Sequence, residues 1–507
     1  MNELRHDIEL TGCAPTPLAH YLKALGILRL VSEQIDKTAQ GWWKNDRFWL
    51  RSKLDREGLI QFFLNEYEPT PIVAPWNGGS GFFPKDNRVA IDAIRSGNAL
   101  RYTNYRTLLA RCERILAELH LEEKPDDQKA ELLQQCRNFF PDRDLDWLDA
   151  AYVLTADGPK YPPLLGTGGN DGRLEFTNNY MQHLVAMVSP DDGTVSPMGQ
   201  SSLNESLFAE QSNVRNSGTI GQFDPGSLGG ANNGTGFEGA STVNSWDFLL
   251  MLDGAMTFAA AAVKKLESSQ RGVLAYPFCV RSTGVGYGSA DRSDEESARS
   301  EMWLPLWNAP ATFSSVSTLM SEGRAVTGRR QARHGVDFAR AIAGLGVDRG
   351  VNEFQRIAFQ QRNGLAYLAV PLGRFQVKGN PDAEELLAPL DHWLDRFRSA
   401  ASGKNAPARA TRALRQIESA IFRLCERGDT RDVQDLLIAL GEAEAAVAIS
   451  QSLREGDKGS GINPVPLLTP DWVTKANDHS TEFRIAAALA SVYDKSVGPM
   501  RRHFEPI

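Results

Sequence analysis

The chain has 507 residues and a formal net charge of −8, and 42% of its residues are hydrophobic and 23% are charged. This is the composition of a folded globular protein, so it excludes a wholly disordered chain, a collagen and a disulfide-stapled mini-protein. The length predicts about two to four domains, and the acidic balance argues against a simple basic nucleic-acid-binding module.

The N-terminal part of the chain alternates helical patterns with turn-rich stretches. An amphipathic helix is predicted over 17–34, because leucines recur at three- and four-residue steps and Pro17 suits the first turn of a helix. The tryptophan-rich stretch 42–50 predicts strand or loop, and the run 69–84 is rich in turn residues. Further helices are predicted, in chain order, over 54–67, 89–96, 99–119, 129–139 and 179–188.

From residue 189 to 241 the composition changes to glycine, serine and asparagine, with eight glycines in the 22 positions 218–239. A structureless stretch of this length inside a domain is uncommon, and we expect a functional or disordered loop. The remaining predictions are, in chain order, an alanine-rich helix over 246–267, short mixed elements over 273–320, an arginine-rich helical region from Ser321, and helix from about Pro381 to Arg454.

These patterns predict a mixed α+β fold with Gly-rich loops in its N-terminal part and a mostly α-helical C-terminal part. We expect four segments: an N-terminal mixed α/β part with Gly/Asn loops (1–188), a Gly/Ser/Asn-rich loop or insertion (189–245), a middle part with an arginine-rich segment (246–380), and a mainly helical C-terminal part (381–507). The sequence has no repeat at a fixed period and no heptad run long enough for a coiled coil.

The cysteines and the first residues predict a soluble cytoplasmic protein. No two of the five cysteines have a CxxC spacing, and an odd number suits neither a disulfide framework nor a structural zinc site, so we expect reduced thiols. The opening MNELRHDIEL is too polar for a secretory signal. The longest apolar stretch nearby, 249–263, is broken by Asp253 and Gly254 and is too short to span a bilayer.

Two glycine-rich loops are candidates for contact with nucleic acid. In the run from Gly166 to Gly172, glycines free backbone N–H groups that can line an anion site, but the lysine of a phosphate-binding P-loop and the GxGxxG spacing are missing. A cradle for a nucleic-acid phosphate and a plain structural turn both stay open. The candidates selected from this loop and its flank are Gly168, Gly169, Asn170 and Arg173.

The run from Trp76 to Phe82 is a similar loop flanked by aromatic residues. Asparagine side chains can pair with base edges and aromatics can stack on unpaired bases, whereas the alternative is a tight turn anchored in the core by its Trp and Phe. The candidates for base-edge or minor-groove contact are Asn77, Asn170, Asn178 and Asn179, with Gly78 and Gly79 in the loop and Lys85 and Arg173 on nearby phosphates.

Few residues suggest catalysis. His6-Asp7 is an isolated pair, whereas metal-dependent phosphohydrolases need further His and Asp ligands around the metal. Four aspartates cluster within 142–149, but acidic residues at the start of a helix ordinarily compensate its dipole. No HExxH, GxSxG or catalytic cysteine signature occurs. The sequence therefore favours a protein that is not an enzyme and has no catalytic or metal-binding residues.

The distribution of arginine points more directly to nucleic acid. The segment 324–362 has a net charge of +5 and the segment 396–431 a net charge of +6, so the rest of the chain carries −19. Arginine suits phosphate because its planar guanidinium donates two parallel hydrogen bonds, although an ordinary solvated helix face is the alternative. The candidates in the first segment are Arg324, Arg329, Arg330, Arg333, Arg340, Arg349, Arg356 and Arg362.

Five strings of the sequence resemble one known family. They are LTGCAPTPLAHYLKALGILRLV (10–31), YEPTPIVAPWNGGSGFFPKDN (67–87), WLDAAYVL (147–154), YPPLLGTGGNDGRLEFTNNYM (161–181) and the closing MRRHFEPI (500–507). Together they look like the large subunit of the type I-G, formerly type I-U, CRISPR effector complex (Cascade), and the resemblance spans almost the whole chain. Sequences of this family continue beyond the closing string, which implies that a C-terminal helical portion with small-subunit function is absent here or separately encoded.

The resemblance implies a non-catalytic subunit of a crRNA-guided antiviral DNA surveillance complex. It would lie at the crRNA 5′ end, recognise the motif that flanks the target (the PAM), help to unwind the duplex and stabilise the R-loop, and help to recruit the helicase-nuclease. RNA–DNA pairing would supply most of the sequence specificity. Implied partners are crRNA, target double-stranded DNA, the backbone subunit, the crRNA 5′-end or processing subunit and a small subunit where one exists, with no cofactor and no membrane.

The glycine and asparagine loops would then contact the flanking duplex, and the arginines of both basic segments would follow the DNA backbone. Two alternatives stay open. The chain could be a metal-dependent nuclease that uses His6 and Asp7 with the acidic cluster, or a purely structural scaffold whose arginines bind protein carboxylates.

Overall fold

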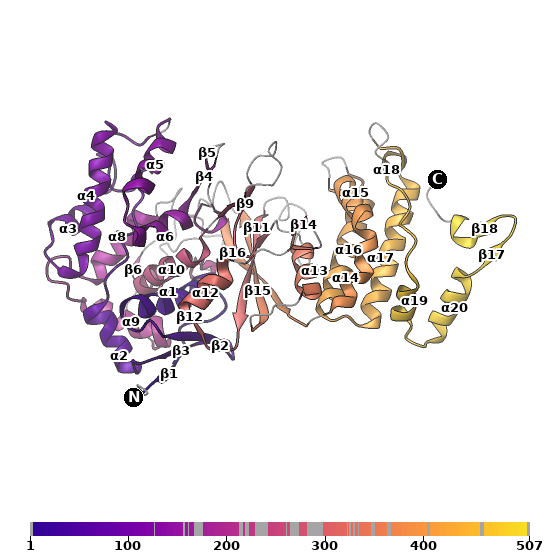
Figure 1. The fold of residues 1–507 in the computed structure, drawn as a ribbon, viewed down its shortest axis with the longest axis horizontal. Coiled ribbons are helices and arrows are strands. Elements are labelled where there is room, and N and C mark those ends of the chain that lie inside the picture. Colours follow the sequence, from indigo (N-terminus) through magenta and orange to yellow (C-terminus); the bar gives the residue numbers. More distant parts are fainter. Residues whose placement is uncertain are drawn as a thin grey trace. The chain divides into compact units, whose positions relative to one another are not determined.

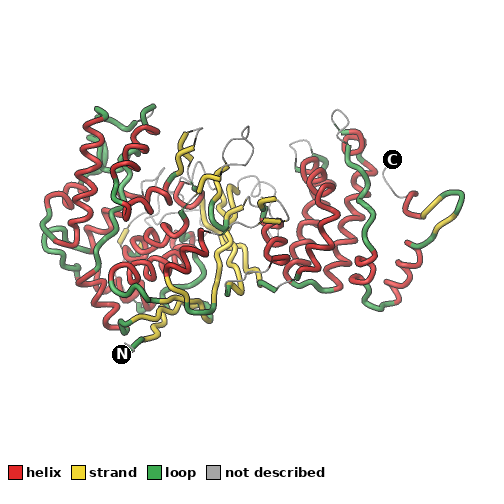
Figure 2. The backbone as a smooth tube through the Cα atoms, in the orientation of Figure 1, coloured by secondary structure: helices red, strands yellow, loops and turns green. Residues whose placement is uncertain are grey.

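A computed structural model describes most of the chain. The described residues are 4–125, 127–155, 158–160, 162–166, 176–211, 216–217, 223–228, 242–259, 261–263, 273–280, 298–321, 323, 326–327, 330–332, 334–345, 350–361, 367–378, 380–402, 406–456 and 461–503. Their fold is mixed α+β, with the larger sheets in the N-terminal part and helices dominating the C-terminal part (Figures 1 and 2). The predicted fold class is confirmed.

The chain divides into two compact units. Unit 1 comprises Met1–Cys279, Arg292–Arg324 and Arg349–Leu372, and unit 2 comprises Val280–Asp291, Ala325–Asp348 and Gly373–Ile507. Unit 1 therefore includes the first two predicted segments and parts of the third, and unit 2 includes the fourth.

The first sheet of unit 1 is antiparallel. Its strands lie in the order β1 (His6–Leu10), β3 (Arg47–Ser52), β2 (Gln40–Lys44) and β12 (Ala311–Thr312). The sequence of β3, RFWLRS, alternates, so every second side chain is buried. Trp43 packs against Phe48 and, edge-on, against Trp307. The stretch 42–50, predicted as strand or loop, thus forms two paired strands.

Helices α1 (Leu18–Gln34) and α10 (Ser245–Ala255) touch backbone to backbone. A Cβ on Gly26 would overlap the carbonyl oxygen of Leu250, and one on Gly254 would overlap that of Leu22. The bounds predicted for the first helix are confirmed to within one residue. Its amphipathic character was a wrong prediction, because α10 and β2 both pack on it and nearly all of its side chains are buried.

The structure describes further helices of unit 1, shown with this pair in Figure 1. They are α2 (Arg56–Gln61), η1 (Phe62–Glu66), α3 (Val89–Ser96), η2 (Leu100–Tyr102), α4 (Thr103–Glu118), α5 (Lys129–Phe139), α6 (Asp142–Ala151), α7 (Pro163–Gly166), α8 (Phe176–Met187), α9 (Pro197–Phe208), η3 (Pro225–Leu228), η4 (Met256–Phe258) and α12 (Phe313–Ser321). Among the described residues, two-stranded pairs are also formed by β4 (Val153–Thr155) with β5 (Gly158–Lys160), β6 (Asn216–Ser217) with β7 (Thr242–Val243), and β8 (Ala261–Val263) with β9 (Val273–Ala275).

Two predictions from composition need correction here. The segment 189–245 is not loop throughout, because α9 lies within it; Ser196 caps this helix by accepting a hydrogen bond from the Gly199 N–H. The helix predicted over 246–267 is too long, since α10 ends at Ala255 and β8 begins six residues later.

The second sheet has the strand order β10 (Cys279–Val280), β11 (Ala298–Trp307), β15 (Val351–Gln361) and β16 (Tyr367–Gln376). β11 and β15 are antiparallel over nearly their whole lengths. The helical prediction for the arginine-rich region is therefore largely wrong, because its last part is the 11-residue strand β15. The rest holds β13 (Val326–Thr327) paired with β14 (Arg330–Gln331), and α13 (Gly335–Leu345).

Unit 2 is mainly helical. After α13 come α14 (Pro381–Leu387), η5 (Ala388–Leu390), α15 (Asp391–Ala401), α16 (Ala408–Glu426), α17 (Thr430–Ile449), α18 (Gln451–Glu455), α19 (Pro470–Ala476), α20 (Thr481–Ala490), the pair β17 (Tyr493–Asp494) and β18 (Gly498–Pro499), and η7 (Met500–His503). The helix predicted over 381–454 is confirmed as α14 to α18. The buried side chains of α16 recur every three to four residues, and α13, α15 and α17 pack on this helix.

Among the helices that the structure describes, none is long and apolar enough to cross a membrane.

Candidate nucleic-acid interface

The loop of residues 76–87 (the 76–87 loop) wraps around one of its own carboxylates. The backbone N–H of Gly79 donates to Asp86 Oδ1 at 2.8 Å, and the N–H of Gly81 donates to Asp86 Oδ2 at 2.9 Å. The N–H of Phe83 also donates to Oδ2, at 3.2 Å. These are the donors from which the glycine-rich sequence could build a phosphate cradle, so Asp86 takes the place of the anion.

Asn178 ties α8 to this loop. Its side-chain nitrogen donates to the carbonyl oxygens of Gly79 at 2.6 Å and Asn87 at 3.0 Å, and its Oδ1 accepts from Gln182 at 3.1 Å. The side chain is 5% exposed. Base-edge contact by Asn178 would require these bonds to break, so in this conformation the residue positions the loop. Its neighbour Asn179 is half-buried.

The base of the loop is in the core. Trp76 is fully buried and packs edge-on against Tyr152, with 5.4 Å between ring centroids. Asn77 is 4% exposed and accepts a hydrogen bond from Lys129 Nζ at 3.4 Å. The anchoring role that the sequence allowed for the tryptophan is the one the structure gives it, and Asn77 lies below the surface.

Lysines form the exposed rim of the loop. The Lys85 side chain is 88% exposed and lies 3.3 Å from the carboxylate of Glu123. A Cβ built on Gly78 would lie 3.1 Å from Cδ of Lys124, so the stem of this exposed lysine lies over the loop. We call the exposed Lys85 and Lys124, together with the half-buried Lys129, the lysine rim. The positive charges of these lysines, beside the 76–87 loop, suit contact with a phosphate.

Two of the predicted arginines are buried and paired with carboxylates. Arg356 is 1% exposed, and its Nε lies 2.7 Å from Oε1 of Glu301, which is fully buried. Arg340 is 6% exposed, and its guanidinium contacts both Glu384, at 3.2 Å, and Asp391, at 2.6 Å. The expectation that these two arginines follow a DNA backbone is corrected, because a guanidinium enclosed with its counter-charge presents no surface to a phosphate.

Several candidates lie outside the described residues: Gly168, Gly169, Asn170, Arg173, Arg324, Arg329, Arg333, Arg349 and Arg362. The backbone of Arg330 is described and forms part of β14.

The second basic segment is partly neutralised within unit 2. Arg398 lies 2.8 Å from Glu418, Arg427 lies 2.9 Å from Asp432, and Arg423 lies 3.2 Å from Asp435. The arginines of this segment that are exposed to solvent include Arg409, Arg412 and Arg431.

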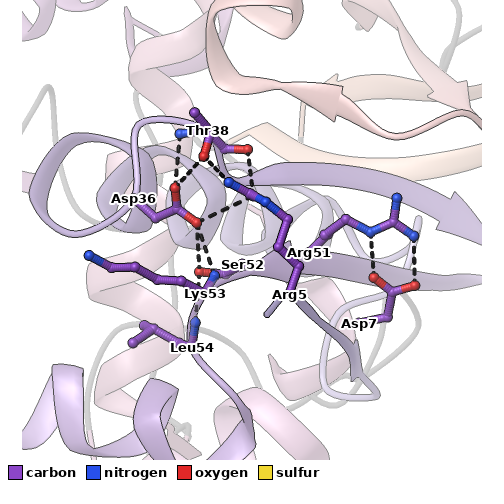
Figure 3. Close-up of polar contacts among 8 residues, drawn as sticks. All are labelled: Arg5, Asp7, Asp36, Thr38, Arg51, Ser52, Lys53 and Leu54. Atoms are coloured by element: carbon purple, nitrogen blue, oxygen red, sulfur yellow. Dashed lines mark hydrogen bonds and ion pairs between the residues drawn. The ribbon is translucent and has the colours of Figure 1, made fainter. Parts of the chain in front are cut away.

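Asp7, of the His6-Asp7 pair, forms an ion pair with Arg51. On the first sheet its two carboxylate oxygens lie 2.6 and 2.8 Å from the guanidinium nitrogens of Arg51, which lowers the pKa of Asp7 (Figure 3). Beside them, Asp36 accepts from the N–H of Thr38 and of Lys53. Within the described ranges, no group of three or more His, Cys, Asp and Glu residues could hold a metal ion.

The aspartates of 142–149 have separate surroundings. Asp144 is 3% exposed, and burial raises its pKa to about 6. Asp149 instead pairs with Arg137. Within the described part of the chain, the aspartates of 142–149 are not part of a group of three or more side chains that could hold a metal ion.

A buried polar network between α1, α9 and α10 was not predicted. Lys23 is 1% exposed, and its Nζ lies 2.6 Å from Asp247 Oδ1 and donates to the Ser206 carbonyl at 2.7 Å. The Ser206 hydroxyl donates to the same carboxylate oxygen at 2.5 Å. The sequence feature that could have indicated this network is Lys23, a lysine in the middle of an apolar helical run.

The titration behaviour of this network favours a structural role. Burial and the neighbouring Lys23 lower the pKa of His20 to about 4, and burial raises the pKa of the Cys13 thiol to about 12. At neutral pH the imidazole is uncharged and the thiol is un-ionised, so Cys13 lacks the thiolate that a nucleophilic cysteine needs.

A scan against protein-family models finds no match for this chain, and a search of curated proteins finds no relative.

Proposed function

We propose that this chain is the non-catalytic large subunit of a crRNA-guided DNA surveillance complex. It would work in the cytoplasm beside the crRNA 5′ end, recognise the motif flanking the target, help to open the duplex, stabilise the R-loop and help to recruit the helicase-nuclease. The proposal starts from the resemblance of five sequence strings to the large subunit of the type I-G CRISPR effector complex.

One observation carries the proposal beyond the resemblance: three of those strings pack on one another. Asn178, from the string 161–181, is hydrogen-bonded to the loop of the string 67–87. Trp147, from the string 147–154, donates from its indole to the Val73 carbonyl at 2.8 Å. Residues about 70 to 100 positions apart thus build one platform, which supports a shared role for the strings.

The lysine rim on this platform supplies the charge. In the proposed complex, Lys85 and Lys124 would contact phosphates of the flanking duplex, while base pairing with crRNA reads the target sequence. Asp86 and Asn178 already hold the 76–87 loop in one conformation, so binding of the duplex would not have to order it. A pre-organised platform of this kind lowers the entropic cost of binding.

The test is reconstitution with crRNA and the effector subunits. We expect the complete complex to bind a duplex that carries the target and its flanking motif, and a complex lacking this chain to lose that binding. A chain that neither joins the complex nor affects target binding would contradict the proposal.

A structural scaffold is the second candidate, and the pairing of Arg340, Arg356 and Arg398 with carboxylates of the chain itself favours it. The two candidates differ in salt dependence. Replacing phosphate contacts changes the slope of affinity against salt, whereas a scaffold variant would alter assembly without changing that slope.

A further inference from the structure

Helices α16 and α17 form a hairpin with an open groove between them, independent of the platform described above. The groove has a volume of about 460 Å³. Arg412, Arg415 and Arg423 of α16 line one side, and Ile438, Ala439 and Glu442 of α17 line the other. From Arg412 to Arg423 the helix rises about 16 Å, which is three turns.

An exposed apolar strip runs along α17 from Ile438, which lines the groove, to Ile449. Ile438 is 62% exposed, and Ile449, three turns further along, is 67% exposed. Between them, Ala445 is exposed, and a Cβ on Gly441 would meet nothing within 4 Å. Positions 438, 441, 445 and 449 share one helix face. Two isoleucines and two small residues on one exposed face match what a partner helix needs in order to pack closely.

The charges beside this strip have opposite signs. Arg412 and Glu442 are both exposed, and neither forms an ion pair with the residues that the structure describes. At the other end, Arg423 and Asp435 bridge the groove at 3.2 Å. A nucleic-acid backbone would bring phosphates against Asp435 and Glu442 and would leave the isoleucines uncovered. A helix with an apolar face and acidic residues along one edge satisfies both features.

We propose that the α16–α17 groove binds an amphipathic helix of a partner protein. The apolar stripe of that helix lies on Ile438 and Ala445, and its acidic edge faces Arg412 and Arg415. This docking surface does not depend on the proposed role in DNA surveillance.

Two labelled peptides of about 18 residues, roughly 27 Å of helix, serve as probes for the full chain. Both carry the same leucine stripe, and the flanking edge is glutamate in one and lysine in the other. In fluorescence anisotropy, we expect saturable binding of the glutamate-edged peptide and at least about tenfold weaker binding of the lysine-edged peptide. No saturable binding of the glutamate-edged peptide below about 1 mM would overturn the proposal.

Variants of the chain test the mode of binding. Ile438→Asn and Arg412→Glu should each weaken the glutamate-edged peptide about tenfold, and Arg412→Glu should improve binding of the lysine-edged peptide. Arg431→Glu, an exposed arginine outside the groove, is the matched control and should change neither. A labelled single-stranded DNA is the competing probe. Binding of DNA that depends on Arg412 and ignores Ile438, with no peptide binding, would assign the groove to nucleic acid instead.

Discussion

The side-chain nitrogen of Asn178 lies 2.6 Å from the carbonyl oxygen of Gly79. Through this bond and a second one to Asn87, one buried residue of α8 fixes the conformation of a loop about 100 positions earlier in the chain. The sequence suggested that Asn178 contacts base edges. In the structure its side chain instead holds the 76–87 loop in place.

Asn178→Ala should destabilise unit 1. The substitution removes both donors and leaves two carbonyl oxygens without these partners, which costs about 1–3 kcal/mol. Chemical denaturation of the full chain measures the change in the free energy of unfolding. Asn138→Ala, an exposed asparagine on α5, is the control and should stay within about 0.5 kcal/mol of the wild type. Equal effects of the two substitutions would remove Asn178 from its supporting role.

Asp86→Ala should convert the 76–87 loop into an anion site. The backbone N–H groups of Gly79, Gly81 and Phe83 lose their acceptor, so the loop loosens and an external anion can replace the carboxylate. We expect sulfate to raise the Tm of this variant more than that of the wild type, at the same ionic strength in chloride. An equal rise in both proteins would indicate only the general effect of sulfate on stability.

Removing one partner of the Lys23–Asp247 pair should destabilise the chain more than replacing both partners. Asp247→Leu leaves the Lys23 ammonium buried without its counter-charge, and we expect a loss of about 3–5 kcal/mol in the free energy of unfolding. The double variant Lys23→Met/Asp247→Leu should recover most of that loss. A double-mutant cycle measures the coupling. If the effects of Lys23→Met and Asp247→Leu alone simply added in the double variant, the pair would not be coupled.

Asp144 should make the stability of the chain fall as the pH rises. Burial raises its pKa to about 6 from the ordinary 3.8, so the folded state holds this proton more tightly than the unfolded state. The penalty is absent below about pH 4, grows between pH 4 and 6, and is complete above pH 6. Asp144→Asn should therefore stabilise the chain by about 2 kcal/mol at pH 8 and have little effect at pH 4. A gain that is the same at both pH values would contradict this assignment.

Much of the helical framework could be predicted from the sequence. The first helix, α3, α5 and the helices of 381–454 follow from the spacing of apolar residues, which is a local signal. β15 could not be predicted in this way. Its partner β11 lies about 50 residues earlier, and pairing with a distant strand can override the local pattern.

The candidate site shows the same limit. For the run 76–82 the sequence allowed a tight turn anchored in the core by its Trp and Phe, and the structure contains a turn whose Trp76 and Phe82 are buried. That Asp86 accepts hydrogen bonds from the backbone N–H groups of this loop depends on the three-dimensional path of the chain, which a local sequence pattern does not show. The burial of Arg340 and Arg356 depends in the same way on carboxylates brought by other elements, so counting charges along the chain overstates the surface charge.

The most direct test of the central claim is photo-crosslinking between the assembled complex and a target-bearing duplex, followed by mapping of the crosslinked peptides. We expect crosslinks from nucleotides next to the flanking motif to the peptides of the lysine rim, residues 76–87 and 124–129. Lys85→Glu/Lys124→Glu should reduce them and lower the salt slope by about 2, while Lys37→Glu/Lys53→Glu, two exposed lysines near the first sheet, should leave both unchanged. Full target binding without any crosslink between DNA and this chain would contradict the account.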